Sequence, residues 1–334
     1  MGRKITKLPK SEVEIESELP EDIFESYFEL ALKKAGQNLE IPGFRNGKAP
    51  EAVLISRIGE MRILEEMAEL ALSDAYPKII AEEKIEALGR PAISITKLAR
   101  KNPLGFKVRT AVLPEIKLPD YKKLAQKVKE ELKKGDQPIE VSDEELSNTI
   151  DDIRKSRAPK DGEPPAFDDT FAQSLGPFKD VNDFKIKLKE NLKLEKENQA
   201  REKTRLKIIE EIIKESKIDL PEILAEIELD KMMHRMESDI AQMGLKFEDY
   251  LKHINKKVED LRVEFRGDAE KKAKLALILN EIAKAEKIVA DEEQVAKEVA
   301  AILDHYKEAD PERARMHAEN VLTNEKIFQF LENL

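Results

Sequence analysis

The chain has 334 residues, of which 38% are charged and 5% aromatic, and its formal net charge is −10. It contains no Cys, which excludes a disulfide framework, a thiol nucleophile and a cysteine-ligated zinc site, and no apolar run reaches the roughly 18 residues of a membrane helix. The length predicts about two domains, and few Gly and Pro among many charges predict long, water-facing helices.

The charge is distributed unevenly. Residues 1–117 are neutral overall, so the whole acidic excess lies in the remainder of the chain. The basic N-terminus, residues 1–10, has no apolar core and is therefore not a signal peptide, which predicts a soluble, cytoplasmic protein. The net acidity disfavours non-specific binding of nucleic acid by the chain as a whole.

The first third of the chain predicts a small α+β domain. Strict alternation of Glu with apolar residues over 12–19 indicates a half-buried strand. A helix is expected from Pro20 to Gly36, then a loop up to Pro50, and then a short helix over 51–58.

A longer helix over 61–84 contains Pro77, which predicts a kink or break. Two strands over 92–98 and 105–113 flank the turn signal Lys101-Asn-Pro-Leu-Gly105 and should pair as a hairpin. Residues 1–117 should thus hold a three- or four-stranded antiparallel sheet.

The middle of the chain gives weaker signals. Residues 118–141 are rich in lysine and allow no assignment to strand, coil or helix. Ser142 with Glu145 forms a capping box that opens a helix over 142–155. The Pro-rich stretch 157–165 is typical of a linker.

From residue 180 onward the pattern predicts only helices. In the first of them the stretch 195–205 is polar on all sides except for Ala200, which indicates a segment that bridges two bodies instead of packing in a core. The five expected helices span 184–216, 221–244, 258–287, 291–306 and 311–332.

No constellation of catalytic or metal-binding residues stands out. The four histidines lack metal-ligand spacing, and any pair chosen from 69 carboxylates has almost no specificity. The stretch from Gly43 to Lys48 is not a phosphate loop, because only three residues separate its glycines and Ala49 replaces the required Ser or Thr. The sequence predicts no catalytic residue, metal or cofactor.

The most specific feature is the loop Ile41-Pro-Gly-Phe-Arg-Asn-Gly-Lys-Ala-Pro50. Its prolines restrict the arms and its glycines permit a sharp tip, which can hold Phe44 outward with Arg45 and Lys48 beside it. An exposed aromatic flanked by cations suits an anionic partner with apolar crevices, such as a ribonucleoprotein surface. The alternative is that Phe44 folds into the core and the cations only solubilise the loop.

The motif Gly43-Phe-Arg-x-Gly-Lys-x-Pro50 resembles the ribosome-docking signature of the trigger factor family of bacterial nascent-chain chaperones. The resemblance continues in Leu113-Pro-Glu-Ile-Lys-Leu-Pro119, and more weakly from Phe167 to the end. It implies an α+β N-terminal ribosome-docking domain followed by an elongated all-α chaperone domain with helical arms. The ribosome-binding residues that it implies are Gly43, Phe44, Arg45, Asn46, Gly47, Lys48 and Pro50.

Two departures from the family pattern matter. The family usually has a basic residue where this chain has Asn46, so docking could be weaker or depend more on Lys48. The family also usually inserts a prolyl-isomerase domain of the FK506-binding type after the helix that matches 142–155. Here residues 157–165 lead directly into Ala166-Phe-Asp168, which leaves no room for that domain and implies a chaperone without isomerase activity.

Client-binding positions are predicted on two helices. Half of the eight methionines lie in 221–244, on a stripe at helical spacing, and Met is common on promiscuous binding surfaces. The alternative is that these residues form ordinary helix-packing core. The candidates are Met232, Met233, Met236, Ile240 and Met243, with Ile327, Phe328 and Phe330 on the last helix.

The sequence therefore predicts a ribosome-binding domain over 1–117, a connecting segment over 118–165 and a client-binding helical domain over 166–334. The predicted protein is an ATP-independent chaperone whose partners are the exit-tunnel protein and rRNA surface of the ribosome and nascent or unfolded polypeptides. The sequence leaves a homodimer open. The rivals are a prolyl isomerase and a ribosome-independent holdase or assembly scaffold with the same arms, including a periplasmic version.

Overall fold

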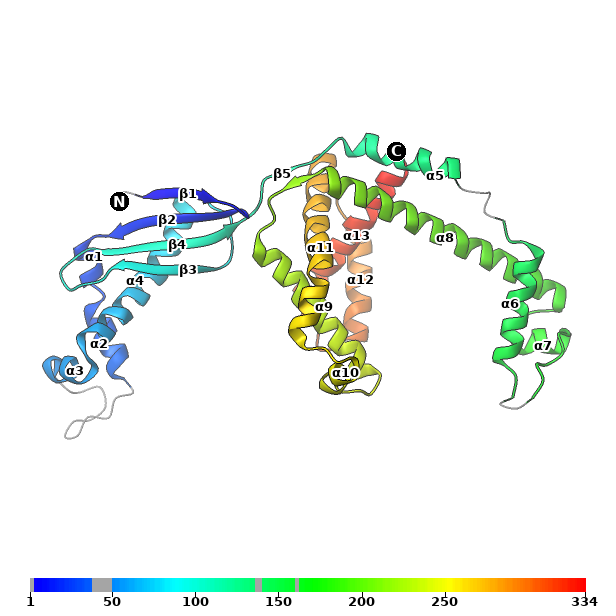
Figure 1. Ribbon diagram of the computed structural model, residues 1–334, viewed down its shortest axis with the longest axis horizontal. Helices are drawn as coiled ribbons and strands as arrows, with labels where there is room; N and C mark the ends of the chain where they lie inside the picture. The colour runs from blue at the N-terminus through cyan, green and yellow to red at the C-terminus, as the bar shows by residue number, and fades with distance from the viewer. Residues whose placement is uncertain (1–2, 38–49, 136–139, 160–161) are drawn as a thin grey trace. The chain divides into compact units, whose positions relative to one another are not determined.

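A computed structural model describes residues 3–37, 50–135, 140–159 and 162–334 of the chain (Figure 1). The chain forms two compact units, each assembled from two separate segments. The first unit comprises Met1–Lys117 and Lys217–Leu277, and the second comprises Leu118–Ser216 and Ile278–Leu334.

The first unit contains the predicted antiparallel sheet, and in the described residues it has four strands. The strands are β1 (Lys4–Leu8), β2 (Glu12–Leu19), β3 (Ala87–Lys97) and β4 (Leu104–Val112), in the spatial order β1-β2-β4-β3. The alternating stretch 12–19 is strand β2 with the predicted bounds, and β3 and β4 form the predicted hairpin. Strand β1 was not predicted, because four of its five residues are exposed and β2 is its only partner among the described strands.

The two faces of this sheet differ in chemistry, as the alternation in β2 requires. Ile15, Phe106 and Val108 are at most 1% exposed and belong to the core beneath the helices. On the opposite face the glutamates of β2 face the cations of β4, and Lys107 forms ion pairs with both Glu14 and Glu16. One face is therefore packed and the other is a solvated charge lattice.

Four helices complete this region: α1 (Glu21–Glu25), α2 (Phe28–Gly36), α3 (Glu51–Ile58) and α4 (Glu60–Glu82). The single helix predicted from Pro20 to Gly36 is wrong, because the chain turns between α1 and α2. At that turn the Ser26 hydroxyl donates to the Ile23 carbonyl at 2.6 Å, which offers the backbone an alternative to helix.

The prediction that the helix breaks at Pro77 is also wrong, since α4 runs through that residue. Pro77 lacks the backbone N–H that any other residue would donate within the helix. The buried residues Ala71, Leu72 and Ile79 on either side keep the helix packed on the core. Strand β3 begins at Ala87, five residues earlier than predicted, because an irregularity between Leu88 and Ala92 accommodates Gly89, at φ 69°, and Pro91 within one strand.

The remainder of the first unit is mainly helical. It contains α9 (Glu222–Gln242), α10 (Phe247–Ile254) and the larger part of α11 (Val258–Glu286). A short β6 (Lys217–Ile218) pairs with β5 (Ile116–Lys117), so the prediction of only helices after residue 180 is wrong at this point. Helix α10 was not predicted, and it has no fully buried side chain that would reveal it.

The second unit consists of helices in the described residues. They are α5 (Tyr121–Gly135), α6 (Asp143–Ser156), α7 (Asp169–Ser174), α8 (Val181–Glu215), α12 (Glu292–His305) and α13 (Pro311–Glu332), with the end of α11. The unassigned lysine-rich stretch forms α5, which buries Ala125 and Val128. The predicted capping box of α6 is present, with Glu145 N donating to Ser142 Oγ at 3.1 Å.

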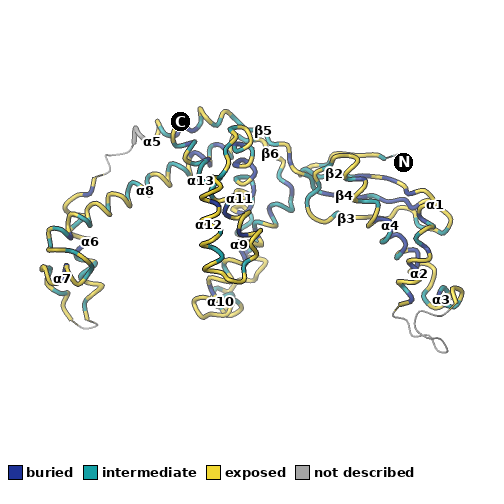
Figure 2. Tube along the Cα trace, turned by 180° about the vertical axis from the view of Figure 1, so that it is seen from behind, coloured by how far each residue is buried: buried dark blue, intermediate teal, exposed yellow. Residues whose placement is uncertain are grey.

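Helix α8 is 35 residues long, and its buried side chains lie toward its two ends. Phe184 joins a small core with Ile150 and Ala172, while Ile208 and Ile212 are buried at the other end. All of the stretch 195–205 is described and none of it is buried, which agrees with the predicted polar middle (Figure 2). Among the described helices, none combines the length and the apolar character that a membrane crossing would need.

Candidate functional site

The signature loop is framed by α2 and α3. Gly43, Phe44, Arg45, Asn46, Gly47 and Lys48 lie outside the described residues, whereas Pro50 is described. Pro50 precedes α3 with extended backbone, and its carbonyl accepts from Val53 N at 3.0 Å and Leu54 N at 3.1 Å. Proline thus starts the helix at the residue that the sequence predicts.

The two helices that frame the loop lie against each other. A Cβ added to Gly36, the last residue of α2, would lie 3.1 Å from Leu54 Cδ2 in the first turn of α3. Gly36 therefore permits a close approach that a larger residue would oppose. This contact places the end of α2 beside the start of α3.

The methionine stripe of α9 opens onto an apolar hollow of about 520 Å³ within the first unit. Met232, Met236, Ile240 and Met243 line it, so the structure brings together four of the five positions predicted on this helix. Met243 is 74% exposed. Leu245, Tyr250 and Phe265 form other parts of the wall, and sequence reasoning did not identify them.

A glycine turn builds one end of this hollow. Gly244 has φ 78°, its N–H donates to Ala241 O at 2.9 Å, and Leu245 N–H donates to Ile240 O at 3.2 Å. These two hydrogen bonds form a Schellman motif, which brings Leu245 back toward Ile240. The helix end thereby adds an exposed leucine to the methionine surface.

Ion pairs fix α9 against α11 on the same unit. Arg262 contacts Glu226 at 2.5 Å and Asp230 at 2.6 Å, and Arg266 contacts Glu226 at 2.7 Å and also Glu222. Two arginines thus clamp three carboxylates of one helix. The clamp keeps α9 and Phe265 of α11 in register around the hollow.

Some predicted client-binding residues are buried. Met233 is 8% exposed, Ile240 5% and Ile327 0%, so these three pack between helices as the alternative reading of the stripe expects. Phe328 and Phe330 are half-buried, and a cation covers each ring: Arg205 lies 5.4 Å from the Phe328 centroid and Lys122 lies 5.5 Å from that of Phe330. The spacing of apolar residues gave no sign of these cations.

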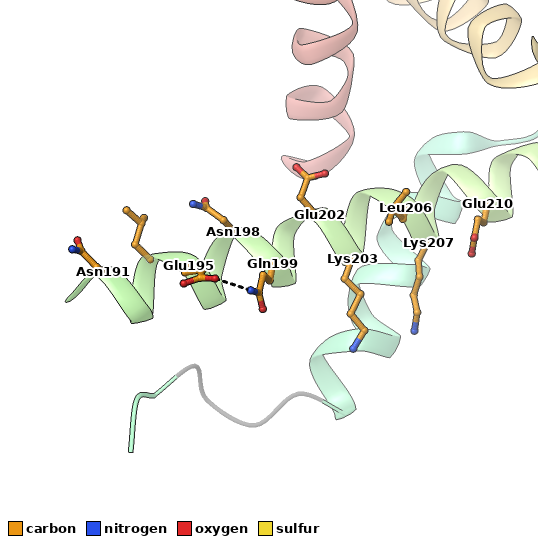
Figure 3. A pocket seen from close by; sticks show the side chains of 10 residues that line it. Asn191, Glu195, Asn198, Gln199, Glu202, Lys203, Leu206, Lys207 and Glu210 are labelled. Atoms are coloured by element: carbon orange, nitrogen blue, oxygen red, sulfur yellow. Dashed lines mark hydrogen bonds between the residues drawn. The ribbon is translucent and has the colours of Figure 1, made fainter. Parts of the chain in front are cut away.

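A second hollow, of about 880 Å³, lies along the polar middle of α8 (Figure 3). Its described wall consists of α8 residues from Asn191 to Glu210, with Leu194 and Leu206 as exposed apolar points at 56% and 63%. Gln199 Nε2 donates to Glu195 Oε1 at 3.2 Å between them. The surface therefore offers many hydrogen-bonding groups and two separated apolar contacts.

In the parts of the chain that the structure describes, no group of three or more His, Asp or Glu side chains is placed to hold a metal ion. The features that do stand out are an α+β domain in which α2 and α3 meet at Gly36 and Leu54, and long helices with hollows beside α8 and α9. They define a class of proteins in which an α+β domain is combined with long helical arms.

The comparisons with known proteins specify this class. The family model for bacterial trigger factor protein matches residues 1–153, and the model for the trigger factor C-terminus matches residues 180–331. The chain belongs to the trigger factor family, which is a family of chaperones. No family model for a middle prolyl-isomerase domain matches, and only residues 154–179 lie between the two matched regions.

Relatives from bacteria align with nearly the whole chain. The trigger factor of Pelotomaculum thermopropionicum is 24% identical over 430 aligned positions, covering 99% of this chain and 96% of its own. The trigger factor of Carboxydothermus hydrogenoformans is 25% identical, with 95% and 94% covered. The 430 aligned positions exceed the 334 residues of this chain, so part of that relative has no counterpart here.

A solved structure supports the fold. It concerns promiscuous substrate recognition in folding and assembly activities of the trigger factor chaperone, and it matches with a TM-score of 0.59 at 16% identity, covering 100% of this chain and 99% of the other. The α+β region followed by long helices is thus the trigger factor fold.

Proposed function

We propose that this protein docks on the ribosome near the exit tunnel and shields nascent or unfolded polypeptides without ATP, in the cytoplasm. The observation that carries the proposal is the motif Gly43-Phe-Arg-x-Gly-Lys-x-Pro50 between α2 and α3 in a chain of the trigger factor family. The motif supplies one aromatic and two cations, which suit a surface of rRNA and protein.

Co-sedimentation with purified ribosomes at two salt concentrations tests docking. The double variant Phe44→Ala/Arg45→Ala should lose most of its binding, and the binding of the unchanged protein should fall at the higher salt because cation–phosphate contacts are screened. The matched control is Met61→Ala/Arg62→Ala, which removes an adjacent apolar residue and cation, both exposed, from α4. Unchanged sedimentation of the loop variant would refute the docking assignment.

Shielding is assigned to the open hollows of the helical region. The hollow beside Met236 and Met243 combines flexible, polarisable side chains with the aromatic rings of Tyr250 and Phe265. Such a surface adapts to many apolar segments, and weak contacts permit release as the client folds. Buried Met233 and Ile327 can contribute only by supporting their helices in this state.

Aggregation of a chemically unfolded client, followed by light scattering, tests this assignment. Met236→Ser/Met243→Ser should weaken suppression several-fold. Met61→Ser/Met316→Ser, which changes two methionines that are 59% and 68% exposed elsewhere, should leave suppression unchanged. Equal suppression by both double variants would show that the α9 hollow does not hold clients.

Asn46 favours one alternative, in which the loop is degenerate and the protein is a ribosome-independent holdase or assembly scaffold. Normal aggregation suppression without ribosome binding would support that alternative. The proposal also assigns no prolyl-isomerase activity to the chain. An X-Pro peptide that isomerises in its presence well above the uncatalysed rate would contradict this point.

A further inference from the structure

The sheet of the first unit ends in an open strand edge. Strand β3 pairs with β4 alone among the described strands, so its other side carries unpaired backbone groups. All residues from Ala92 to Lys97 are exposed, as the tube of β3 in Figure 2 illustrates. The earlier part of the strand is less open, because a Cβ on Gly89 would meet Ile223 Cδ1 of α9.

Side chains along the β3 edge alternate between large apolar residues and small residues. Ile93 lies opposite Val108 and Ile95 opposite Phe106, so both isoleucines are on the core face of the sheet. They are nevertheless 40% and 42% exposed, because the helices do not cover the edge. Ala92, Ser94 and Thr96 alternate with them and are small. A strand placed beside β3 would therefore cover two apolar side chains on one face and meet small ones on the other.

The two edges of the sheet differ in protection. Edge strands are commonly guarded by short length, lysine or proline. Strand β1 has only five residues, of which Lys4 and Lys7 are cationic. Between Pro91 and Lys97 strand β3 has five consecutive residues without a charge or a proline. Within residues 92–96 the β3 edge thus lacks the lysines of the opposite edge, and Pro91, Lys97 and an irregularity between Ile95 and Lys97 bound this open stretch.

We propose that the β3 edge from Ala92 to Lys97 binds an extended segment of unfolded polypeptide by strand addition. A row of backbone N–H and C=O groups is complemented only by another extended backbone, and this recognition is independent of side-chain identity. Ile93 and Ile95 add a preference for a segment with apolar residues at every second position. The inference rests on the proposed chaperone function and adds a second, backbone-directed client site to the one proposed in the helical hollows.

Hydrogen–deuterium exchange of the full chain tests the site. The probe is a synthetic peptide of alternating valine and threonine with a lysine at each end. At a peptide concentration about ten times its Kd, the amides in 92–97 that point away from β4 should exchange about tenfold more slowly. The same peptide with every amide between the lysines N-methylated keeps its side chains but cannot donate, and it should give no protection there.

Paired substitutions separate this site from a general apolar effect. Ile93→Thr/Ile95→Thr keeps β-branched residues in the strand and should weaken protection at β3, whereas Ile5→Thr on β1, at 40% exposure, should not. Unchanged exchange in β4 shows that each variant is folded.

Three results would overturn the inference. Protection confined to α9 and α10 would leave the chaperone proposal standing and remove the strand site. Equal protection by the N-methylated peptide would exclude backbone pairing. Protection of β3 that follows protein concentration without peptide would identify a second copy of the chain as the occupant. Absence of protection anywhere would instead count against client binding itself.

Discussion

At the residue scale, Arg205 joins two carboxylates of α13 to α8. Its guanidinium forms two bidentate pairs, with Glu325 at 2.8 and 3.0 Å and with Glu332 at 2.6 and 3.2 Å. Its side chain is only 13% exposed. Because bidentate, partly desolvated pairs are the strong ones, this residue fixes the end of α13 on α8.

Replacing Arg205 by Met should lower the free energy of unfolding by about 2 kcal/mol, because the carboxylates of Glu325 and Glu332 would lose their hydrogen-bonded partner. Urea unfolding followed by circular dichroism measures the change. Lys203→Met, which removes an exposed cation from the same helix, serves as the control and should change the midpoint little.

The same pair predicts a pH dependence. The hydrogen bonds from Arg205 lower the pKa of Glu325 below its usual value of 4.5. A lowered pKa in the folded state adds stability above the unfolded value and loses it as the pH falls through the folded value. The stability gap between the unchanged protein and Arg205→Met should therefore be constant above pH 4.5 and shrink below it. A gap that stays constant in acid would contradict this assignment.

At the scale of an element, glycine stabilises the end of one helix and destabilises the interior of another. Gly244, with φ 78°, closes α9, whereas Gly267 lies inside α11, and an added Cβ would meet no atom within 4 Å at either position. Gly244→Ala should cost about 1 kcal/mol of stability and loosen the wall formed by Leu245. Gly267→Ala should add up to about 1 kcal/mol by raising helix propensity.

Thermal unfolding measures both substitutions, and binding of an apolar dye reports on the hollow beside Met243. Only Gly244→Ala should alter dye binding. If both substitutions stabilise the protein, the left-handed turn does not exist in solution.

Elements with a local signal were predictable from the sequence. The alternation in 12–19, Pro50 before α3 and the Ser142–Glu145 capping box each set an element through neighbouring residues. Elements held by distant contacts were not. For example, Tyr121 of α5 donates a hydrogen bond to Glu286 of α11 at 2.5 Å, across 165 residues of sequence. Burial of the Tyr121 side chain and this hydrogen bond raise the pKa of Tyr121 to about 12.

The candidate site follows the same division. Spacing placed Met232, Met236 and Met243 on one helix face, because helical periodicity is a local property. Tyr250 and Phe265 reach the hollow from α10 and α11, and tertiary packing of these helices brings them there. Periodicity along one helix also could not show that cations cover Phe328 and Phe330.

At the scale of the whole molecule, the net charge is confined to one part of the chain. Residues 1–117 are neutral and include the cations of the loop, while the rest of the chain carries the net charge of −10. Under the proposed function, the acidic remainder of the chain would be repelled by rRNA, and the loop with its two cations is the part suited to contact it. Docking and shielding should then be separable by mutation.

A cell-free translation of an aggregation-prone protein tests this separation. Phe44→Ala/Arg45→Ala should suppress aggregation of a free, unfolded client as well as the unchanged protein does, because the hollows are intact. During translation it should need at least about tenfold more chaperone for the same soluble yield, because docking raises the local concentration of weak binding surfaces near the emerging chain. Met61→Ala/Arg62→Ala should behave like the unchanged protein in both assays. Identical dose–response curves for all three proteins during translation would mean that tethering contributes nothing to shielding, and they would favour a holdase that acts without the ribosome.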